Sequence, residues 1–176
     1  WGCIQSHRAC IEAAIEQKCR NILILEDDIL LSKDFTRQVE TFLDQVPENW
    51  DCLMLGGEHA APPQLVDSEV VRCRETRKTH CYAVNGAFLK TMLSAYQHSN
   101  DRCSRVMAAV TNVANVFAPT EFIAGQHAGY SDIWDHTRTF DYMGHERVSA
   151  ELSPRAQRLS ICHHCEYGAA NDDHDS

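Results

Sequence analysis

Three consecutive carboxylates, Glu26, Asp27 and Asp28, follow the apolar run Ile22–Leu25. The run predicts a strand buried on both faces, and open α/β sheets bind ligands at the carboxyl ends of their strands. Because side chains alternate along a strand, Glu26 and Asp28 are expected on one side and Asp27 on the other. Clustered carboxylates repel one another, and Mg²⁺ or Mn²⁺ held by oxygen ligands relieves that repulsion. The triplet therefore predicts a divalent metal site, with a charged loop that only ends the strand as the alternative.

A second candidate is the segment Gly-Cys-Ile-Gln-Ser-His at residues 2–7, where a helical periodicity begins. The first turn of a helix offers free backbone N–H groups and the positive end of the helix dipole, which together favour a phosphate. Gly2 would permit close approach of the backbone, and Ser6 and His7 would add donors. A serine at this place more often caps its helix, and a histidine more often lies on the surface. The segment alone leaves both interpretations open.

The elements that must position these residues alternate between helix and strand through the first half of the chain. Helices are expected from about residues 4, 35, 85 and 106, and strands at 21–26, 51–55, 69–73, 79–84 and 116–118. This alternation favours an α/β fold with a mostly parallel central sheet, and the chain is long enough for one domain. We expect that domain to span residues 1–160, with a tail at 161–176.

Further short motifs follow in order along the chain. After the helix start and the Glu-Asp-Asp strand come Asp-Cys-Leu-Met-Leu-Gly at 51–56, Thr-His-Cys-Tyr at 79–82, Gly-Ala at 86–87, Ala-Pro at 118–119, Gln126, and Ser-Asp-Ile at 131–133. In this order the motifs resemble glycosyltransferase family 25, the group of lipopolysaccharide glycosyltransferases and collagen galactosyltransferases. The resemblance covers roughly residues 1–133.

The resemblance implies a GT-A-like, three-layer sandwich that moves a sugar, with inversion, from a nucleotide-sugar donor to a hydroxyl of a glycan or other acceptor. A UDP-sugar is the expected donor. Glu26 and Asp28 would hold Mn²⁺ or Mg²⁺ against the diphosphate, with Asp27 beside the donor, because a metal neutralises the charge on the leaving nucleoside diphosphate. Asp101 is the implied general base, with the N-cap of the following helix as its alternative role.

The late polar residues complete the implied site. Gln126 and Ser131 are expected to contact the phosphates or the acceptor. Many metal-dependent GT-A enzymes take a further ligand from a late histidine, so His127 or His136 is a candidate, and we favour His127. Two solvent-exposed histidines are the alternative.

Members of the family carry a nucleotide-binding strand and helix upstream of the Gly-Cys-x-x-Ser-His motif. This sequence opens at Trp1, directly before that motif. We therefore expect a GT-A-like domain that is incomplete at its N-terminus. A non-catalytic module that binds a glycan or a partner protein is the alternative function, and the intact acidic triplet favours the enzyme.

Composition limits the partners. The 176 residues are 44% hydrophobic and 23% charged, as in an ordinary globular domain. The formal net charge of −9 repels phosphate backbones, so nucleic acid is not an expected partner. No segment approaches the ~20 apolar residues of a membrane-spanning helix.

The sequence contains nine cysteines at irregular spacings. An odd count within hydrophobic patterns predicts mostly free thiols in a reducing compartment, and we expect the cytoplasm. Cys162 and Cys165, which flank two histidines, match half of a zinc site. No second pair follows them, so an ordinary C-terminal segment is the alternative.

Overall fold

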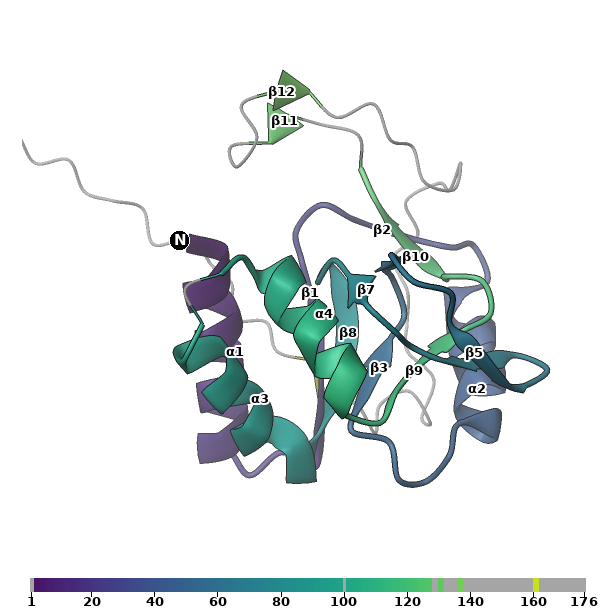
Figure 1. Ribbon diagram of the computed structural model, residues 1–176, viewed down its shortest axis with the longest axis horizontal. Coiled ribbons are helices and arrows are strands. Elements are labelled where there is room, and N and C mark those ends of the chain that lie inside the picture. Colours follow the sequence, from purple (N-terminus) through teal and green to yellow (C-terminus); the bar gives the residue numbers. More distant parts are fainter. Residues whose placement is uncertain (1, 100, 128–129, 132–135, 138–159, 162–176) are drawn as a thin grey trace, which may run out of the picture.

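The computed structural model describes residues 2–99, 101–127, 130–131, 136–137 and 160–161 (Figure 1). The helices are α1 (Gly2–Glu16), α2 (Phe35–Gln45), α3 (Leu89–Gln97) and α4 (Cys103–Val113), with a 3₁₀ turn η1 (Gly86–Phe88) before α3. The strands are β1 (Asn21–Leu25), β2 (Ile29–Leu31), β3 (Cys52–Met54), β4 (Glu58–His59), β5 (Gln64–Asp67), β6 (Val70–Arg72), β7 (Thr76–Arg77), β8 (Cys81–Asn85), β9 (Val116–Pro119), β10 (Ala124–Gln126), β11 (Tyr130–Ser131), β12 (His136–Thr137) and β13 (Ser160–Ile161). The α/β class and the helices and strands expected from the sequence are confirmed.

The central sheet has the strand order β13-β1-β8-β3-β9-β6-β5. The pairs β1–β13 and β3–β9 are parallel, whereas β1–β8, β8–β3, β9–β6 and β6–β5 are antiparallel. The expectation of a mostly parallel sheet is therefore wrong for the described part of the chain.

The physical reason lies in the connections. A parallel neighbour needs a crossover connection, which α2 supplies between β1 and β3, so these two strands run in the same direction. Between β3 and β8 the chain instead forms the short antiparallel pairs β5–β6 and β4–β7. It returns without a helix, and β8 enters antiparallel between β1 and β3.

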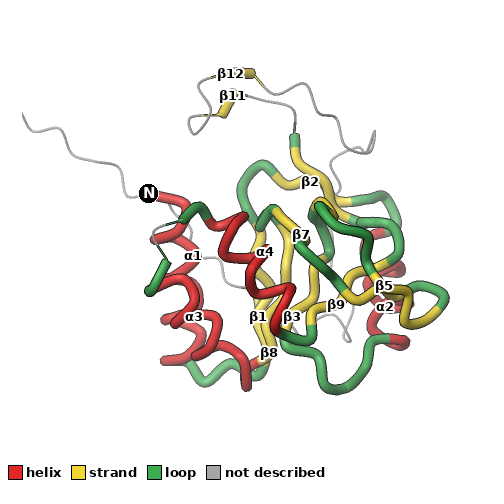
Figure 2. The backbone as a smooth tube through the Cα atoms, in the orientation of Figure 1, coloured by secondary structure: helices red, strands yellow, loops and turns green. Residues whose placement is uncertain are grey.

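Helices cover both faces of the sheet (Figures 1 and 2). On one face α1, α3 and α4 pack against Ile22, Ile24 and Tyr82. On the other face α2 packs against residues of opposite alternation, such as Leu23 and Leu53. Phe35, Val39 and Phe42 recur at helical spacing on α2 and are all buried, as the amphipathic pattern predicts. No helix among the described residues is long and apolar enough to cross a bilayer.

The carboxyl ends of β1 and β3 lie at the same edge of the sheet, beside the start of β8. The backbone N–H of Glu26 donates to the His80 carbonyl at 3.0 Å, which fixes the acidic triplet next to the β8 strand. The β2–β10 pair, in which Gln126 lies opposite Ile29, brings the late chain to the same place. This edge collects residues from both ends of the described sequence.

Candidate functional site

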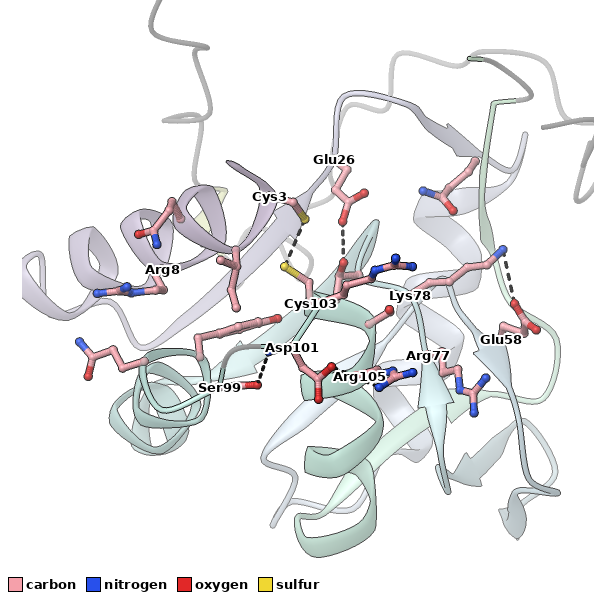
Figure 3. A pocket seen from close by; sticks show the side chains of 18 residues that line it. Cys3, Arg8, Glu26, Glu58, Arg77, Lys78, Ser99, Asp101, Cys103 and Arg105 are labelled. Carbon is pink, nitrogen blue, oxygen red and sulfur yellow. Dashed lines mark hydrogen bonds and ion pairs between the residues drawn. The ribbon is translucent and has the colours of Figure 1, made fainter. Parts of the chain in front are cut away.

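A cleft of about 650 Å³ lies beside the carboxyl end of β1 (Figure 3). Three residues that the sequence assigned to the site, Glu26, Asp101 and Gln126, line it. The first turns of two helices also line it, through Cys3 on α1 and Cys103 on α4. Neither first turn carries an acidic residue, so two positive helix ends border one cleft.

The charge of the cleft is opposite to that of the whole chain. Its lining contains three carboxylates, those of Glu26, Glu58 and Asp101. Glu58 forms an ion pair with Lys78, with 3.8 Å between Oε2 and Nζ. Arg8 is noteworthy because its Nε is buried and has no hydrogen-bond partner among the described residues. The cationic side chains in the lining are Arg8, Arg77, Lys78, Arg102 and Arg105. A chain of net charge −9 thus presents a mainly cationic cleft, which suits an anionic ligand.

Glu26 is held by two donors. The Thr79 hydroxyl donates to Glu26 Oε1 at 2.6 Å, and His7 Nε2 lies 3.2 Å from the same oxygen. Burial alone would raise the pKa of Glu26, but the hydrogen bonds from His7 and Thr79 outweigh it and hold the pKa below its usual value. Glu26 is therefore a carboxylate, and both bonds fall on Oε1, which leaves Oε2 to meet a ligand.

His7 is buried, not on the surface, and connects Glu26 to a pair of tyrosines. Its Nδ1 lies 2.9 Å from the Tyr82 hydroxyl, which in turn lies 3.3 Å from the Tyr96 hydroxyl. The imidazole also stacks on both phenol rings, at 5.6 and 5.8 Å between ring centres. Burial alone would lower the pKa of His7, but its interactions with Cys3 and Glu26 raise it to about 9. At neutral pH His7 is a cation that donates both ring protons within the protein.

Asp28 contacts the late part of the described chain. The Gln126 amide donates to Asp28 Oδ2 at 3.1 Å, and the His127 backbone N–H donates to the Asp28 carbonyl at 2.8 Å. Burial, and then the negative charge of Glu26, raise the pKa of Asp28 above its usual value. The Asp28 carboxylate therefore experiences charge repulsion from Glu26, and its hydrogen bonds within the described residues come from an amide and not from a cation.

Asp101 is exposed on the loop before α4, and its Oδ1 accepts a hydrogen bond from Arg105 Nη1 at 3.3 Å. The residue at the N-cap position is Arg102, and no side chain caps this helix. The alternative in which Asp101 serves as the cap is therefore wrong. Its carboxylate lines the cleft instead, and its Arg105 partner lines the cleft too (Figure 3).

The comparison with known families decides what kind of protein carries this cleft. Residues 1–107 match the model of glycosyltransferase family 25, which is described as an LPS biosynthesis protein. The chain belongs to glycosyltransferase family 25. None of the curated proteins compared with the chain matches it.

In this family 25 glycosyltransferase, four other residues that were expected in the site do not line the cleft. Gly2 and Ser6 are exposed, and the Ser6 hydroxyl donates to the Gly2 carbonyl at 3.2 Å. Asp27 and the side chain of His127 are exposed as well. None of these four is part of the cleft lining. Their predicted roles stay predictions.

Several expectations concern parts of the chain where little is described. Ser131 lies in β11 and His136 in β12, and only their backbone is described. Asp132, Ile133, Cys162 and Cys165 lie outside the described residues, as does most of the expected tail. The roles proposed for these residues stay predictions.

Glu26, Asp28 and His127 do not form a three-residue cluster of close ligand atoms in the described part of the glycosyltransferase. The cluster that does form joins Cys3, His7 and Cys103, with one ligand atom of each within 4.8 Å of the others. Sequence patterns do not predict this cluster, because Cys103 is distant from Cys3 and His7 in the chain.

Sequence reasoning also missed the cationic lining and the residues that hold Glu26 and His7. Thr79 and Tyr82 belong to the Thr-His-Cys-Tyr motif, so a signal was present in the sequence. Its meaning depended on β8 lying next to β1, which places Thr79 beside Glu26 and Tyr82 beneath His7.

Proposed function

We propose that this family 25 member is a metal-dependent, inverting glycosyltransferase with a UDP-sugar donor and a hydroxyl acceptor on a glycan or similar molecule. The observation that carries the proposal is the cationic cleft at the end of β1, in which Glu26 and Asp101 stand among five cationic side chains. A nucleoside diphosphate is anionic, and a sugar hydroxyl needs a general base, such as a carboxylate, to accept its proton. One cleft offers both kinds of group.

The diphosphate would bind between the first turns of α1 and α4. Free backbone N–H groups and the positive dipole end of each helix favour a phosphate there. Cys3, Ile4 and Gln5 line the cleft from α1, and Ser104 and Arg105 line it from α4. Arg8 adds a guanidinium to the cleft lining that would pair with a phosphate oxygen.

The chemistry of the residues at the end of β1 supports the proposal of a divalent cation there. The raised pKa of Asp28 reflects burial and the negative charge of Glu26, and a cation would relieve that repulsion. Asp28 and Oε2 of Glu26 would supply hard oxygen ligands, with His127 as a further candidate, and substrate phosphates would complete the shell. When bound, the metal would neutralise charge on the leaving nucleoside diphosphate. His7 and Thr79 would position Glu26 through their bonds to Oε1.

Asp101 would accept the proton of the acceptor hydroxyl. Asp101 lines the cleft, as does its ion-pair partner Arg105, and a carboxylate is a group that can serve as a general base. Gln126 would hold Asp28 in place through its amide. Gly2, Ser6, Asp27 and Ser131 would contact the donor or the acceptor.

Two broader features belong to the same proposal. The helices on both faces of the sheet, with the acidic motif at a strand end, support a GT-A-like arrangement. The seven described cysteines are all free, which supports a reducing compartment such as the cytoplasm.

Calorimetry with UDP and Mn²⁺ tests the metal site. The unmodified protein should bind UDP in the presence of Mn²⁺, and both chelation and Asp28→Asn should remove the metal-dependent part of the binding. Asp34→Asn is the matched control, because Asp34 is an exposed aspartate at the start of α2 and should leave binding unchanged. Equal metal-dependent binding by the unmodified protein and Asp28→Asn would rule out the metal role of Asp28.

A second pair of variants tests the diphosphate site. Arg8→Ala should weaken UDP binding about tenfold, because a charged hydrogen bond in the cleft is lost. Arg37→Ala on α2 is the control, since Arg37 is exposed and bonded to Asp34 away from the cleft. Binding of a glycan with no binding of UDP would favour the non-catalytic module instead.

A further inference from the structure

Two thiols from distant parts of the chain meet in the cleft. Cys3 lies in the first turn of α1 and Cys103 is the first residue of α4. Their Sγ atoms lie 3.2 Å apart, although the residues are 100 positions apart in sequence (Figure 3). Both residues line the cleft, so a small molecule in the cleft can reach the pair.

We propose that Cys3 and Cys103 are a redox-active pair, which a peroxide oxidises to a disulfide that joins the first turns of α1 and α4. The Cys3 thiolate attacks one oxygen of hydrogen peroxide, the O–O bond breaks, and Cys3 sulfenic acid and hydroxide form. The Cys103 sulfur then attacks the Cys3 sulfur, the S–O bond breaks, and the proton of Cys103 goes to the departing hydroxide to give the disulfide and water. The hydroxide of the first step takes up the proton that Cys3 released when it ionised, so two thiols are oxidised by two electrons and one peroxide is reduced to two waters.

The surroundings favour Cys3 as the attacking thiol. It is half-buried, and the first turn of a helix stabilises a thiolate. The hydrogen bond with Cys103 is the main cause that lowers the pKa of Cys3 to about 5, with help from the His7 cation and against the opposing effect of burial. The same contact raises the pKa of Cys103, which therefore keeps its proton until the second step.

The sulfur geometry favours a disulfide over a metal site. Cys3, His7 and Cys103 are a donor set that zinc uses. Both ring nitrogens of His7, however, already bond within the protein, to Tyr82 and to Glu26. Two thiolates on a tetrahedral zinc ion would also stand about 3.8 Å apart, given a Zn–S bond of about 2.3 Å. At 3.2 Å the two sulfurs are closer than that, and a shift of about 1.2 Å would form the S–S bond.

Peptide mapping without reduction tests the proposal directly. The reduced protein is treated with hydrogen peroxide, alkylated and digested with trypsin. We expect a disulfide-linked pair formed by residues 1–8 and residues 103–105, in most of the protein, and its loss on treatment with dithiothreitol. Closing so long a loop should also raise the midpoint of thermal unfolding by about 10 °C.

Matched thiol variants give a readout that does not depend on the disulfide itself. Cys19 is the other half-buried thiol among the described residues, and Cys19→Ser should leave the linked peptide intact. In Cys103→Ser, peroxide should leave Cys3 as sulfenic acid, which dimedone captures. In the reduced unmodified protein, iodoacetamide at pH 7 should label Cys3 about tenfold faster than Cys19, because the lowered pKa of Cys3 keeps it largely thiolate at that pH.

Three outcomes would overturn the proposal. After peroxide treatment Cys3 and Cys103 could remain as alkylatable as Cys19. The linked peptides could instead join either thiol to other cysteines. The purified protein could also carry one equivalent of zinc that is lost in Cys3→Ser. Each measurement uses the full chain, unmodified or with one cysteine replaced, and needs no transferase activity, so its result is independent of the proposed function.

Discussion

His7 Nε2 lies 3.2 Å from Glu26 Oε1, and this contact joins the first helix to the end of the first strand. The His7 side chain is 5% exposed and that of Glu26 is 25% exposed, so water screens the pair only weakly. The Gly-Cys-x-x-Ser-His motif and the Glu-Asp-Asp motif thus each supply one member of this ion pair. The pair holds one carboxylate of the acidic triplet in place and leaves Asp28 to a separate set of contacts.

A double-mutant cycle should detect this ion pair. His7→Gln and Glu26→Gln remove one charge each, keep the approximate size, and should each cost about 2 kcal/mol in the free energy of unfolding. The coupling between the two changes should be about 1 kcal/mol or more, measured by urea unfolding. The exposed pair Arg37–Asp34 is the control, and its coupling should be only a few tenths of a kcal/mol. Strictly additive effects at His7 and Glu26 would contradict the buried pair.

The pH dependence of stability should reveal that Cys3 and His7 compensate each other. The pKa of His7 is raised from 6.5 to about 9, so its contribution is complete below pH 6.5 and is lost as the pH rises through 9. The pKa of Cys3 is lowered from 9.0 to about 5, so its contribution is present above pH 9 and is lost as the pH falls through 5. Between pH 6.5 and 9 the two slopes are opposite, and the pair should change the free energy of unfolding little.

Cys3→Ser removes the contribution of Cys3 to the pH dependence of stability and leaves that of His7. The variant should lose stability as the pH rises above 6.5, because Glu26 still raises the pKa of His7. The measurement is the urea midpoint across this range in metal-free, reducing buffer, with Cys19→Ser as the control that keeps the unmodified profile. Parallel profiles for Cys3→Ser and the unmodified protein would contradict the assigned charge states.

Local sequence predicted the elements well, because they depend on nearby residues. The apolar run before Glu26 predicted β1, and the spacing of Phe35, Val39 and Phe42 predicted α2. The order of strands depends on contacts between distant segments, which periodicity does not encode. The antiparallel entry of β8 between β1 and β3 was missed for this reason.

The same limit applies to the site. Alternation along β1 predicted Glu26 and Asp28 on one side and Asp27 on the other, but the chain turns at Asp27 and Asp28, and alternation did not indicate their partners. Thr79 reaches Glu26 because β8 adjoins β1, and Cys103 reaches Cys3 because α4 begins beside α1. Each contact spans more than fifty residues, so each became visible only in the folded chain.

Gly56 is required by the space that His80 occupies. A Cβ atom at Gly56 would lie 2.7 Å from the Ala124 carbonyl oxygen and would also collide with the His80 ring, which packs over the glycine. His80 is buried and its Nε2 lies 3.3 Å from that same oxygen. Gly56→Ala should therefore cost about 2 kcal/mol in the free energy of unfolding, measured by urea.

Gly2→Ala is the control for this change, since nothing lies within 4 Å of a Cβ at Gly2. That variant should unfold at the same urea concentration as the unmodified protein or slightly higher. A Gly56→Ala variant as stable as Gly2→Ala would show that His80 can move aside without cost.

Asp101→Asn tests the general base. In an inverting transfer the base accepts a proton from the acceptor hydroxyl as the new bond forms, and only an ionised carboxylate within about 3 Å of that hydroxyl can do so. Asparagine keeps the size of Asp101 but cannot take the proton. Turnover in an active protein that contains this chain should fall by on the order of 10² to 10⁴, with UDP binding nearly unchanged.

The control for Asp101→Asn is Asp34→Asn, which removes an equally exposed aspartate paired with an arginine one helical turn away. The side chains of Asp34 and Asp101 are 62% and 54% exposed, and their arginine partners Arg37 and Arg105 are 78% and 72% exposed. Both ion pairs are solvent-screened, so either change should leave thermal stability almost unaltered. Only Asp101 lines the cleft, so only Asp101→Asn should lower turnover. A rate loss below about fivefold in Asp101→Asn would show that Asp101 is not the general base. Because Asp101 does not cap α4 either, its remaining role would be the ion pair with Arg105, and another residue of the cleft would have to be the base.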